Sequence, residues 1–391
     1  MHRSRSLPEP MPLRIAFCTD SLPPVVDGVT GTLQALVPTL LESGVEFLFV
    51  SAVMPDRAWP WHDRVHQVRN VRFPLYRSYR LALPVARTLD PVLDRFAPDV
   101  LHVVTPSLLG LFGVRYGRRR GVPVVASFHT DFVALFRHYR LRWLEGLGRR
   151  LMRGFYNQCA VTLAPSHTTA AMLRDRGITN VALWPRGVTR ERFDPSFRSA
   201  ALRARLDGGA PILLYVGRLA QEKNLEYLVA AVRQLEQWDV SFKLVLVGEG
   251  PMRAQLEREL PAAHFAGFVP PDRLAPWYAS ADLFVFPSTN ETFGNVVLEA
   301  FASGLPVIGV DQGAVRELVT PGRDGVLAQP GEPLTFAEEI RFLLAHPGLR
   351  ARLGDRARAT ATEHSWSAVN ARLLDCYARV IAAQPSSIEA A

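Results

Sequence analysis

Cysteine is scarce in this chain of 391 residues, which has only Cys18, Cys159 and Cys376. Three cysteines so far apart argue against a disulfide framework or a cysteine-rich metal site and fit a reducing compartment. Long apolar runs are also missing: no stretch approaches the ~18 uninterrupted apolar residues of a membrane span, and the N-terminus has no apolar signal-peptide core. We therefore expect a cytoplasmic protein with globular cores, which an apolar content of 48% can supply.

Lysine is almost absent, since Lys223 and Lys243 are the only two among the 45 basic residues. The net charge of +8 is unevenly distributed: residues 1–190 carry 25 basic and 13 acidic side chains, and residues 191–391 carry 20 and 24. A basic half and a mildly acidic half indicate two domains with different partners. A general preference for arginine explains the high pI equally well.

Apolar runs of strand length alternate with helical patterns along both halves of the chain. Strands are expected at 13–19, 47–52, 100–104, 122–127, 212–216, 243–247, 283–287 and 307–310, and helices at 33–43, 225–237, 296–303 and 365–382. Continuous Val, Ile and Leu runs between helices are typical of parallel sheets that are covered on both faces. The sequence therefore predicts an α/β protein with two doubly wound, Rossmann-like domains.

The predicted domains are residues 1–190 and 191–364, followed by a C-terminal helical segment at 365–391. The connection at 184–195 is rich in Pro, Gly and charge. In doubly wound folds, ligands bind at the carboxyl ends of the strands. A cleft between the two domains is therefore the expected ligand site.

The stretch Pro287-Ser-Thr-Asn-Glu-Thr-Phe-Gly-Asn-Val-Val-Leu-Glu299 leads from a buried strand through a polar loop into a helix. Backbone N–H groups at a helix start attract anions. Glu291 lies before the helix and Glu299 inside it, and carboxylates can accept hydrogen bonds from two neighbouring sugar hydroxyls. Taken alone, however, the two glutamates suit an ordinary solvated helix start better than a site.

The loop after the strand at 212–216 changes that balance. It reads Gly217-Arg-Leu-Ala-Gln-Glu-Lys-Asn224 and places Arg218 and Lys223 at the carboxyl edge of the expected sheet. Arginine offers a planar fork and lysine a compact charge, a pair suited to a diphosphate. A solvated basic loop is the alternative.

These motifs, with Ala302-Ser-Gly-Leu-Pro-Val307 downstream, resemble glycosyltransferase family 4, whose members have the GT-B fold. The resemblance covers most of the chain and is strongest over 212–325. It implies two domains facing a deep cleft and a terminal helix that crosses back to the first domain. It also implies a nucleotide-sugar donor site, with these residues: Gly28, Arg218, Lys223, Phe268, Glu291, Phe293, Gly294, Asn295, Val296 and Glu299.

Within this resemblance, Arg218 and Lys223 hold the donor diphosphate and stabilise the leaving group. Glu291 binds hydroxyls of the donor sugar, Glu299 binds the ribose, and the base rests near Phe268. The backbone from Phe293 to Val296 meets the sugar and the phosphates. With His129, the residues Glu291, Arg218 and Lys223 form the implied catalytic set.

The first half contributes weaker signals. Gly28 opens the first helix and allows close approach of a phosphate, although such glycines are common in α/β folds. His129, after the strand at 122–127, is implied by the family to contact the donor sugar, whereas a lone histidine is usually a packing residue. Asp20 and Asp131 also follow strands and are candidates for contact with the acceptor.

The family retains the anomeric configuration, which implies attack by the acceptor hydroxyl on the face that the diphosphate leaves. No Asp-x-Asp occurs in the sequence, so we expect neither a metal nor any other cofactor. Two rival enzyme classes are a nucleotide-sugar 2-epimerase, which the motif set disfavours, and an oxidoreductase. Against the latter, Gly248-Glu-Gly-Pro-Met-Arg253 lacks the third glycine of a dinucleotide fingerprint. A nucleic-acid binder is suggested only by the high pI.

The acceptor must be inferred from the basic half. Its arginines are interleaved with aromatic and aliphatic residues, as on a helix that lies on anionic lipid; they are Arg118, Arg119, Arg120, Arg137, Arg140, Arg142, Arg149, Arg150 and Arg153. Packing of this helix on its own domain is the alternative.

We expect a lipid acceptor and a peripheral position on the inner face of the membrane. The motifs are similar to the glycolipid-forming branch, with its diacylglycerol mannosyltransferases and sulfoquinovosyl-type transferases. A polysaccharide or small-molecule acceptor remains the alternative, and both UDP- and GDP-linked hexoses remain open as donors.

Overall fold

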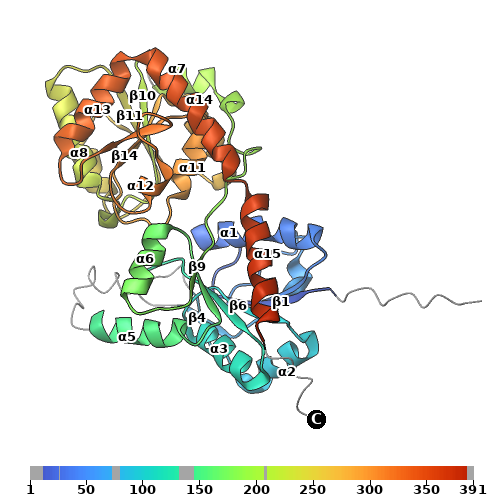
Figure 1. The fold of residues 1–391 in the computed structure, drawn as a ribbon. Coiled ribbons are helices and arrows are strands. Elements are labelled where there is room, and N and C mark those ends of the chain that lie inside the picture. Colours follow the sequence, from blue (N-terminus) through green and yellow to red (C-terminus); the bar gives the residue numbers. More distant parts are fainter. Residues whose placement is uncertain (1–11, 26, 73–79, 132–144, 207–208, 385–391) are drawn as a thin grey trace, which may run out of the picture. The chain divides into compact units, whose positions relative to one another are not determined.

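The computed structural model describes residues 12–25, 27–72, 80–131, 145–206 and 209–384. The chain divides into two compact units (Figure 1). Unit 1 comprises Met1–Ala164, Met172–Trp184 and Asn370–Ala391, and unit 2 comprises Pro165–Ala171 and Pro185–Val369. This division falls near the expected connection at 184–195.

Unit 1 is built on a seven-stranded sheet in the order β3-β2-β1-β6-β7-β8-β9. Its strands are β1 (Arg14–Thr19), β2 (Glu46–Ser51), β3 (Val65–Gln67), β6 (Val100–Val103), β7 (Val124–Ser127), β8 (Val161–Ala164) and β9 (Val181–Leu183). Every pairing in this sheet is parallel. A short antiparallel pair, β4 (Asn70–Arg72) and β5 (Arg80–Ala82), stands apart from it. The helices of the first half are α1 (Gly28–Glu42), α2 (Ala86–Phe96), α3 (Leu108–Arg120), α5 (Glu145–Tyr156) and α6 (His167–Asp175).

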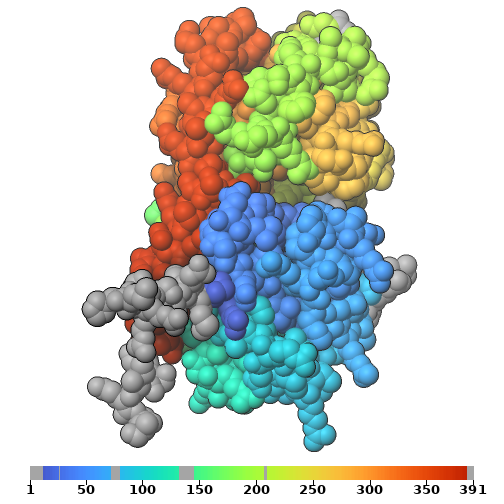
Figure 2. All heavy atoms as spheres, turned by 90° about the vertical axis from the view of Figure 1, so that its right-hand side faces the viewer, coloured from blue at the N-terminus to red at the C-terminus, as the bar shows by residue number. Residues whose placement is uncertain are grey.

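The C-terminal helix α15 (Trp366–Ala382) joins unit 1 from Asn370 onward. Leu373 and Tyr377 recur at helical spacing and are 1% and 0% exposed. The Asn370 amide donates to the Ala35 carbonyl and to the Thr39 hydroxyl of α1, both at 3.1 Å. In the space-filling view, α15 in red lies against α1 in blue (Figure 2). The helix is therefore a packed element of the unit.

Unit 2 contains a six-stranded sheet in the order β12-β11-β10-β13-β14-β15, with helices on both faces (Figure 1). Its strands are β10 (Ile212–Val216), β11 (Lys243–Val247), β12 (His264–Gly267), β13 (Leu283–Phe286), β14 (Val307–Val310) and β15 (Gly325–Ala328). Its helices are α7 (Ala200–Leu206), α8 (Leu225–Gln237), α9 (Arg253–Glu259), α10 (Ala275–Ser280), α11 (Asn295–Ala302), α12 (Val315–Leu318), α13 (Pro333–Ala345) and α14 (Pro347–Glu363). Two parallel, doubly wound sheets confirm the predicted fold class.

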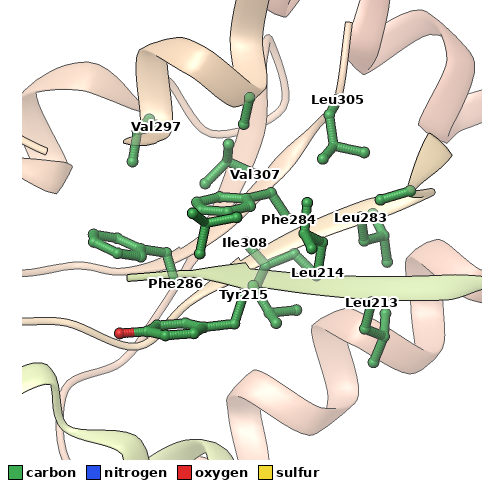
Figure 3. Packing of buried hydrophobic residues seen from close by; sticks show 14 of the residues in the cluster. Leu213, Leu214, Tyr215, Leu283, Phe284, Phe286, Val297, Leu305, Val307 and Ile308 are labelled. Carbon is green, nitrogen blue, oxygen red and sulfur yellow. The ribbon is translucent and has the colours of Figure 1, made fainter. Parts of the chain in front are cut away.

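The centre of the second sheet is apolar on both faces. β10 pairs in parallel with β13 through Leu213 opposite Leu283 and Leu214 opposite Phe284. Figure 3 shows these side chains packed above and below the strands. Burial of this apolar surface is the main source of stability and contributes about 25 cal/mol per Å². Because β10 and β13 are parallel neighbours, the loops that follow them emerge side by side.

Two glycines explain why the Gly248–Arg253 segment looks like part of a nucleotide fingerprint. A Cβ on Gly248 would lie 1.9 Å from the Gly217 carbonyl oxygen, and one on Gly250 would lie 2.2 Å from that of Leu219. The backbone N–H of Leu219 donates to the carbonyl of Glu249 at 2.9 Å. These glycines therefore let the loops after β10 and β11 pack backbone to backbone.

None of the helices in the described ranges combines the length and the apolar content that a bilayer-spanning helix needs.

Candidate functional site

The loops after β10 and β13 bring together two of the predicted donor-site residues. Lys223 Nζ lies 2.6 Å from Glu291 Oε1, although 68 residues separate them in sequence. The hydroxyl of Ser288, which is fully buried, donates to the same carboxylate oxygen at 2.6 Å. The Lys223 and Glu291 side chains are 22% and 14% exposed. A partly buried ion pair that is still open to solvent can exchange its mutual contact for contacts with a ligand.

Arg218 stands at the start of the same loop with half of its side chain exposed. Its guanidinium contacts the Glu222 carboxylate one turn later. Tyr215 is the fourth residue of β10 (Figure 3), and its hydroxyl donates to the Arg218 carbonyl at 3.1 Å. The loop is therefore anchored by its backbone, while the guanidinium reaches into solvent.

Asn224 ends the Lys223 loop in the left-handed conformation, with φ of 55°. Its side-chain amide donates to the Pro287 carbonyl at 3.1 Å. Asparagine tolerates this conformation better than most residues and can hydrogen-bond locally. Asn224 thus ties the β10 loop to the β13 loop and holds Lys223 and Glu291 in register.

The N-terminus of α11 lies just beyond Glu291. Gly294 takes a φ of 103° at the N-cap, and no side chain caps the helix. The N–H groups of the first turn, at Asn295 and Val296, therefore lack the usual capping partner. The Phe293 side chain is 6% exposed and belongs to the core, so that only its backbone can face a ligand. This arrangement suits an anion.

Glu299 lies one turn further along α11 and is partly buried. The hydroxyl of Tyr278 donates to its Oε2 at 2.7 Å. Burial raises the pKa of Glu299 to about 7, against the opposing effects of the Tyr278 hydrogen bond and the charge of Arg192. Near neutral pH this carboxyl can therefore gain or lose its proton.

Phe268 follows β12 directly and is 59% exposed. Gly267, which ends the strand, has a φ of 73°. An exposed aromatic ring at the carboxyl edge of the sheet offers a surface for a planar base, and contact with the base remains a prediction.

In unit 1, Gly28 is the first residue of α1, and the carboxylate of the N-cap Asp27 accepts from the Thr30 N–H at 2.7 Å. An anion at this helix start would meet that carboxylate. Asp20 is 1% exposed and accepts from the Thr105 hydroxyl at 2.8 Å. Contact of Gly28 with a phosphate and of Asp20 with an acceptor both remain predictions.

His129 and Asp131 follow β7 in unit 1. The Ser127 hydroxyl lies 2.9 Å from His129 Nε2. Both Asp131 oxygens accept from the guanidinium of Arg176, at 2.9 and 2.7 Å. Asp131 and Arg176, together with Arg149 and Arg153 of α5, line a small cavity in unit 1. Asp131 therefore takes part in a fixed ion pair within a basic pocket.

The predicted basic surface divides into two parts. Arg119 and Arg120, at the end of α3, form ion pairs with Asp90 and Asp94 of α2 at 2.8 and 2.5 Å, so these two charges are neutralised locally. Arg118 lies in the last turn of the same helix and is exposed. Arg137, Arg140 and Arg142 lie outside the described residues.

Helix α5 has an unusual outer face. Leu147 and Leu151 are 54% and 60% exposed, and Arg149, Arg150 and Arg153 are exposed on the same helix. Phe155 and Tyr156 are buried and attach the helix to unit 1. The helix therefore packs on its own unit and still presents leucines and arginines to solvent.

Sequence reasoning missed Ser288, Tyr278, Asn224 and Arg176. The proximity of Ser288 to Glu291 was a usable signal, because a small hydroxyl three residues before a carboxylate can reach it. The partnership of Tyr278 with Glu299 had no signal, since it depends on how α10 packs on α11. Among the described residues, no group of three or more His, Cys, Asp or Glu is gathered so that it could hold a metal.

Both halves of the chain match known protein families. Residues 26–192 match the family described as "Glycosyltransferase Family 4", and residues 210–346 match "Glycosyl transferases group 1". A GDP-mannose-dependent alpha-mannosyltransferase of Mycobacterium tuberculosis is 38% identical over 94% of this chain and 97% of its own length. The chain belongs to glycosyltransferase family 4.

Other members of the family support the resemblance to its glycolipid-forming branch. The sulfoquinovosyl transferase of Arabidopsis thaliana is 31% identical over 93% of this chain and 72% of its own length. The alpha-monoglucosyldiacylglycerol synthase of Streptococcus pneumoniae is 26% identical over 86% of this chain and 80% of its own length. These likenesses favour a transferase over the epimerase and oxidoreductase alternatives.

The fold agrees with a solved GT-B structure. Sucrose-phosphate synthase from Thermosynechococcus elongatus matches with a TM-score of 0.75 and 21% identity, covering 95% of this chain and all of the other. The predicted GT-B class is confirmed, and the family 4 chain is a glycosyltransferase that uses a nucleotide sugar.

Removing the Lys223 ammonium should weaken binding of a nucleotide sugar. In Lys223→Ala we expect the affinity for GDP-mannose or UDP-glucose to fall about 10- to 100-fold, the range for a lost hydrogen bond to a charged group. Thermal-shift titration measures the loss as smaller stabilisation by the same ligand concentration.

The other lysine provides a matched control. Lys243 begins β11 and donates to the Ala262 carbonyl at 2.5 Å, at the amino end of the sheet. Lys243→Ala should bind like the wild type. Equal ligand stabilisation in the two variants would remove Lys223 from the site.

The titration of Glu299 should make donor affinity depend on pH. Because its pKa is raised to about 7, the carboxylate form, which we predict accepts two ribose hydroxyls, becomes populated as the pH rises from 6 to 8. Affinity should increase up to about tenfold over this interval, as measured by isothermal titration calorimetry with GDP-mannose, whose diphosphate diester does not titrate there.

The same shift has a consequence for stability. Since the folded-state pKa is raised, the folded chain holds this proton more tightly than the unfolded chain. The contribution of Glu299 to stability is therefore lost as the pH rises from about 4.5 to about 7.

Glu299→Gln should flatten the pH dependence of donor affinity, whereas Glu226→Gln, at an exposed position of α8, should preserve it. A wild-type affinity that is constant from pH 6 to 8 contradicts the ribose role.

Proposed function

We propose that this chain is a retaining mannosyltransferase that transfers mannose from GDP-mannose to a hydroxyl of a membrane lipid without a metal. The observation that carries the proposal is the Lys223–Glu291 pair, 2.6 Å apart beside the uncapped start of α11. The choice of GDP-mannose follows the mycobacterial relative, which is 38% identical over 94% of the chain.

In the proposed donor complex, the diphosphate displaces Glu291 as the partner of Lys223. The exposed guanidinium of Arg218 and the N–H groups of α11 supply further positive charge. Glu291, freed from the ammonium but still held by Ser288 at 2.6 Å, accepts from hydroxyls of the mannose. The same rearrangement thus provides a partner for the diphosphate and a partner for the sugar.

The same charges act during the reaction. As the bond between the anomeric carbon and the diphosphate oxygen breaks, negative charge grows on the leaving diphosphate. Lys223, Arg218 and the α11 dipole stabilise it from fixed positions. The acceptor hydroxyl attacks the same face that the diphosphate leaves and passes its proton to the departing phosphate oxygen, so that the anomeric configuration is retained. His129 is assigned to contact the donor sugar.

The lipid acceptor is inferred from unit 1. Leu147 and Leu151 of α5 are exposed next to Arg149, Arg150 and Arg153, a combination that binds the interface of anionic membranes. Arg149 and Arg153 of the same helix also line the basic cavity beside Asp131. The pneumococcal relative is an alpha-monoglucosyldiacylglycerol synthase.

The assay that tests this function offers GDP-mannose, UDP-glucose and UDP-sulfoquinovose separately, with a total lipid extract as acceptor. We expect mannose in the lipid fraction, an α-linkage by NMR, and an unchanged rate in excess EDTA. Transfer only from a UDP-sugar would overturn the assignment of GDP-mannose as the donor. A product with inverted anomeric configuration would overturn the retaining mechanism. Loss of activity in EDTA that Mg²⁺ restores would overturn metal independence. Transfer only to a polysaccharide or a small molecule would overturn the lipid acceptor.

The exposed leucines of α5 should be needed for membrane binding. The double variant Leu147→Gln, Leu151→Gln should sediment several-fold less with phosphatidylglycerol-rich vesicles at low salt, because about 25 cal/mol per Å² of buried apolar surface is lost.

The matched control is Leu41→Gln, Leu334→Gln, which changes two leucines that are 47% and 48% exposed on α1 and α13. It should sediment like the wild type, and neither change should alter the melting temperature appreciably. Equal sedimentation of both double variants, or none by the wild type, contradicts the membrane role of α5.

A further inference from the structure

A line of hydrogen bonds runs through unit 1 from helix α15 to His129. The Tyr377 hydroxyl lies 2.5 Å from His102 Nδ1. His102 Nε2 lies 2.8 Å from the Ser127 hydroxyl, and that hydroxyl lies 2.9 Å from His129 Nε2. Hydrogen bonds thereby link four side chains one after another, from the C-terminal helix, β6, β7 and the segment after β7.

Three of the four side chains are inaccessible to solvent. Tyr377 and His102 are 0% exposed and Ser127 is 1% exposed. Aromatic rings pack around His102: the ring centroids of Phe17 and Trp184 lie 5.3 and 5.7 Å from it. Water therefore does not compete for these hydrogen bonds, and each buried polar atom must be satisfied by its neighbours.

The inventory of donors and acceptors determines the direction of the chain. A tyrosine hydroxyl has one hydrogen, and among the described residues the partner of this buried hydroxyl is His102 Nδ1. Tyr377 therefore donates, and His102 Nδ1 accepts. A neutral imidazole that accepts at Nδ1 carries its hydrogen on Nε2. His102 consequently donates to Ser127, which in turn donates its own hydrogen to His129 Nε2.

The opposite direction is disfavoured for the same reason. If His129 Nε2 carried the hydrogen, it would donate to Ser127, Ser127 would donate to His102, and His102 would donate to Tyr377. The Tyr377 hydrogen would then be buried without its acceptor. Burial also holds the pKa of Tyr377 well above its usual range, so the phenol keeps that hydrogen.

We infer that Tyr377, His102 and Ser127 are positioning residues that hold His129 in the tautomer with its hydrogen on Nδ1. This inference rests on the proposed function in one respect, namely the role assigned to His129. In this tautomer Nε2 accepts from Ser127, which fixes the orientation of the ring, and Nδ1 carries the hydrogen. The C-terminal helix thus takes part in setting the chemistry of a residue 248 positions earlier in the sequence.

The tautomer can be observed directly in the intact wild-type protein. Two-bond proton–nitrogen correlation spectra of the ¹⁵N-histidine-labelled chain report which nitrogen of each of its 10 histidines carries hydrogen. Spectra of His102→Gln and His129→Gln assign the signals. We expect His129 with hydrogen on Nδ1, although free imidazole side chains prefer it on Nε2, and His102 with hydrogen on Nε2. A His129 signal of the Nε2-protonated form overturns the inference without any variant that must fold.

Tyr377→Phe removes the hydroxyl that orients the chain. We expect the His129 signals to move to a mixture of tautomers and kcat for sugar transfer to fall by about tenfold or more, with KM for the donor within twofold of the wild type. Ser127→Ala should act similarly, and Ser127→Thr, which restores a hydroxyl, should recover the tautomer. Unmoved His129 signals in both Tyr377→Phe and Ser127→Ala would overturn the inference.

Tyr116→Phe is the matched control. Tyr116 is 2% exposed in the same unit, and its hydroxyl donates to Asp94 at 2.8 Å, away from His129. This variant loses a tyrosine hydrogen bond of the same kind, so any loss of stability is comparable, and the His129 signals and kcat should stay as in the wild type. If kcat falls equally in Tyr116→Phe and Tyr377→Phe, the effect of Tyr377 is structural only.

Failure of the proposed function has a different signature. If His129→Gln retains full transferase activity while the wild-type spectrum shows hydrogen on Nδ1, the hydrogen-bond chain stands and the role of His129 in transfer falls. If His129→Gln is inactive and the wild-type tautomer is the Nε2-protonated form, the role stands and the positioning chain falls.

Discussion

The parallel pairing of β10 with β13 is the constraint on which the candidate donor site depends. Parallel neighbours end at the same edge of the sheet, so the loops that follow them must emerge together. Leu213 lies opposite Leu283 in this register. As a result, Lys223 Nζ and Glu291 Oε1 lie 2.6 Å apart in the loops that follow. A slip of this register would separate the pair, because side chains alternate between the two faces of a strand.

Around this pair, backbone contacts supply rigidity and side chains supply charge. The Asn224 amide ties one loop to the other, and Gly248 and Gly250 let a third loop pack against the first without side chains between them. Neutralising Lys223 with Glu291 lowers the cost of partial burial before a ligand arrives. A ligand that offers both phosphate and hydroxyl groups satisfies each member of the pair separately, which an inorganic anion cannot do.

The two units solve the problem of buried polar groups in different ways. In unit 2, Glu299 is partly buried and accepts from Tyr278, and burial raises its pKa to about 7 against the effect of that hydrogen bond. In unit 1, Tyr377, His102 and Ser127 are buried together and satisfy one another as neutral groups. The first arrangement leaves a carboxyl that titrates near neutrality, and the second leaves a fixed set of hydrogen positions. Both depend on how a helix packs, α10 in unit 2 and α15 in unit 1, and the Tyr377 of α15 lies 275 residues from His102.

Much of this molecule is determined by local sequence. The strands at Ile212–Val216, Lys243–Val247 and Val307–Val310 and the helix at Leu225–Gln237 form where the sequence predicts them, because apolar periodicity and glycine ends are local properties. The motif residues Arg218, Lys223, Glu291 and Glu299 could also be named, through the resemblance of these motifs to glycosyltransferase family 4. Tertiary structure alone decided which of them meet: that Glu291 takes Lys223 as its partner, that Asp131 is engaged by Arg176, and that His129 is joined to Tyr377. These contacts span 68, 45 and 248 residues, and such separations are set by strand order and helix packing, which no local pattern of residues encodes.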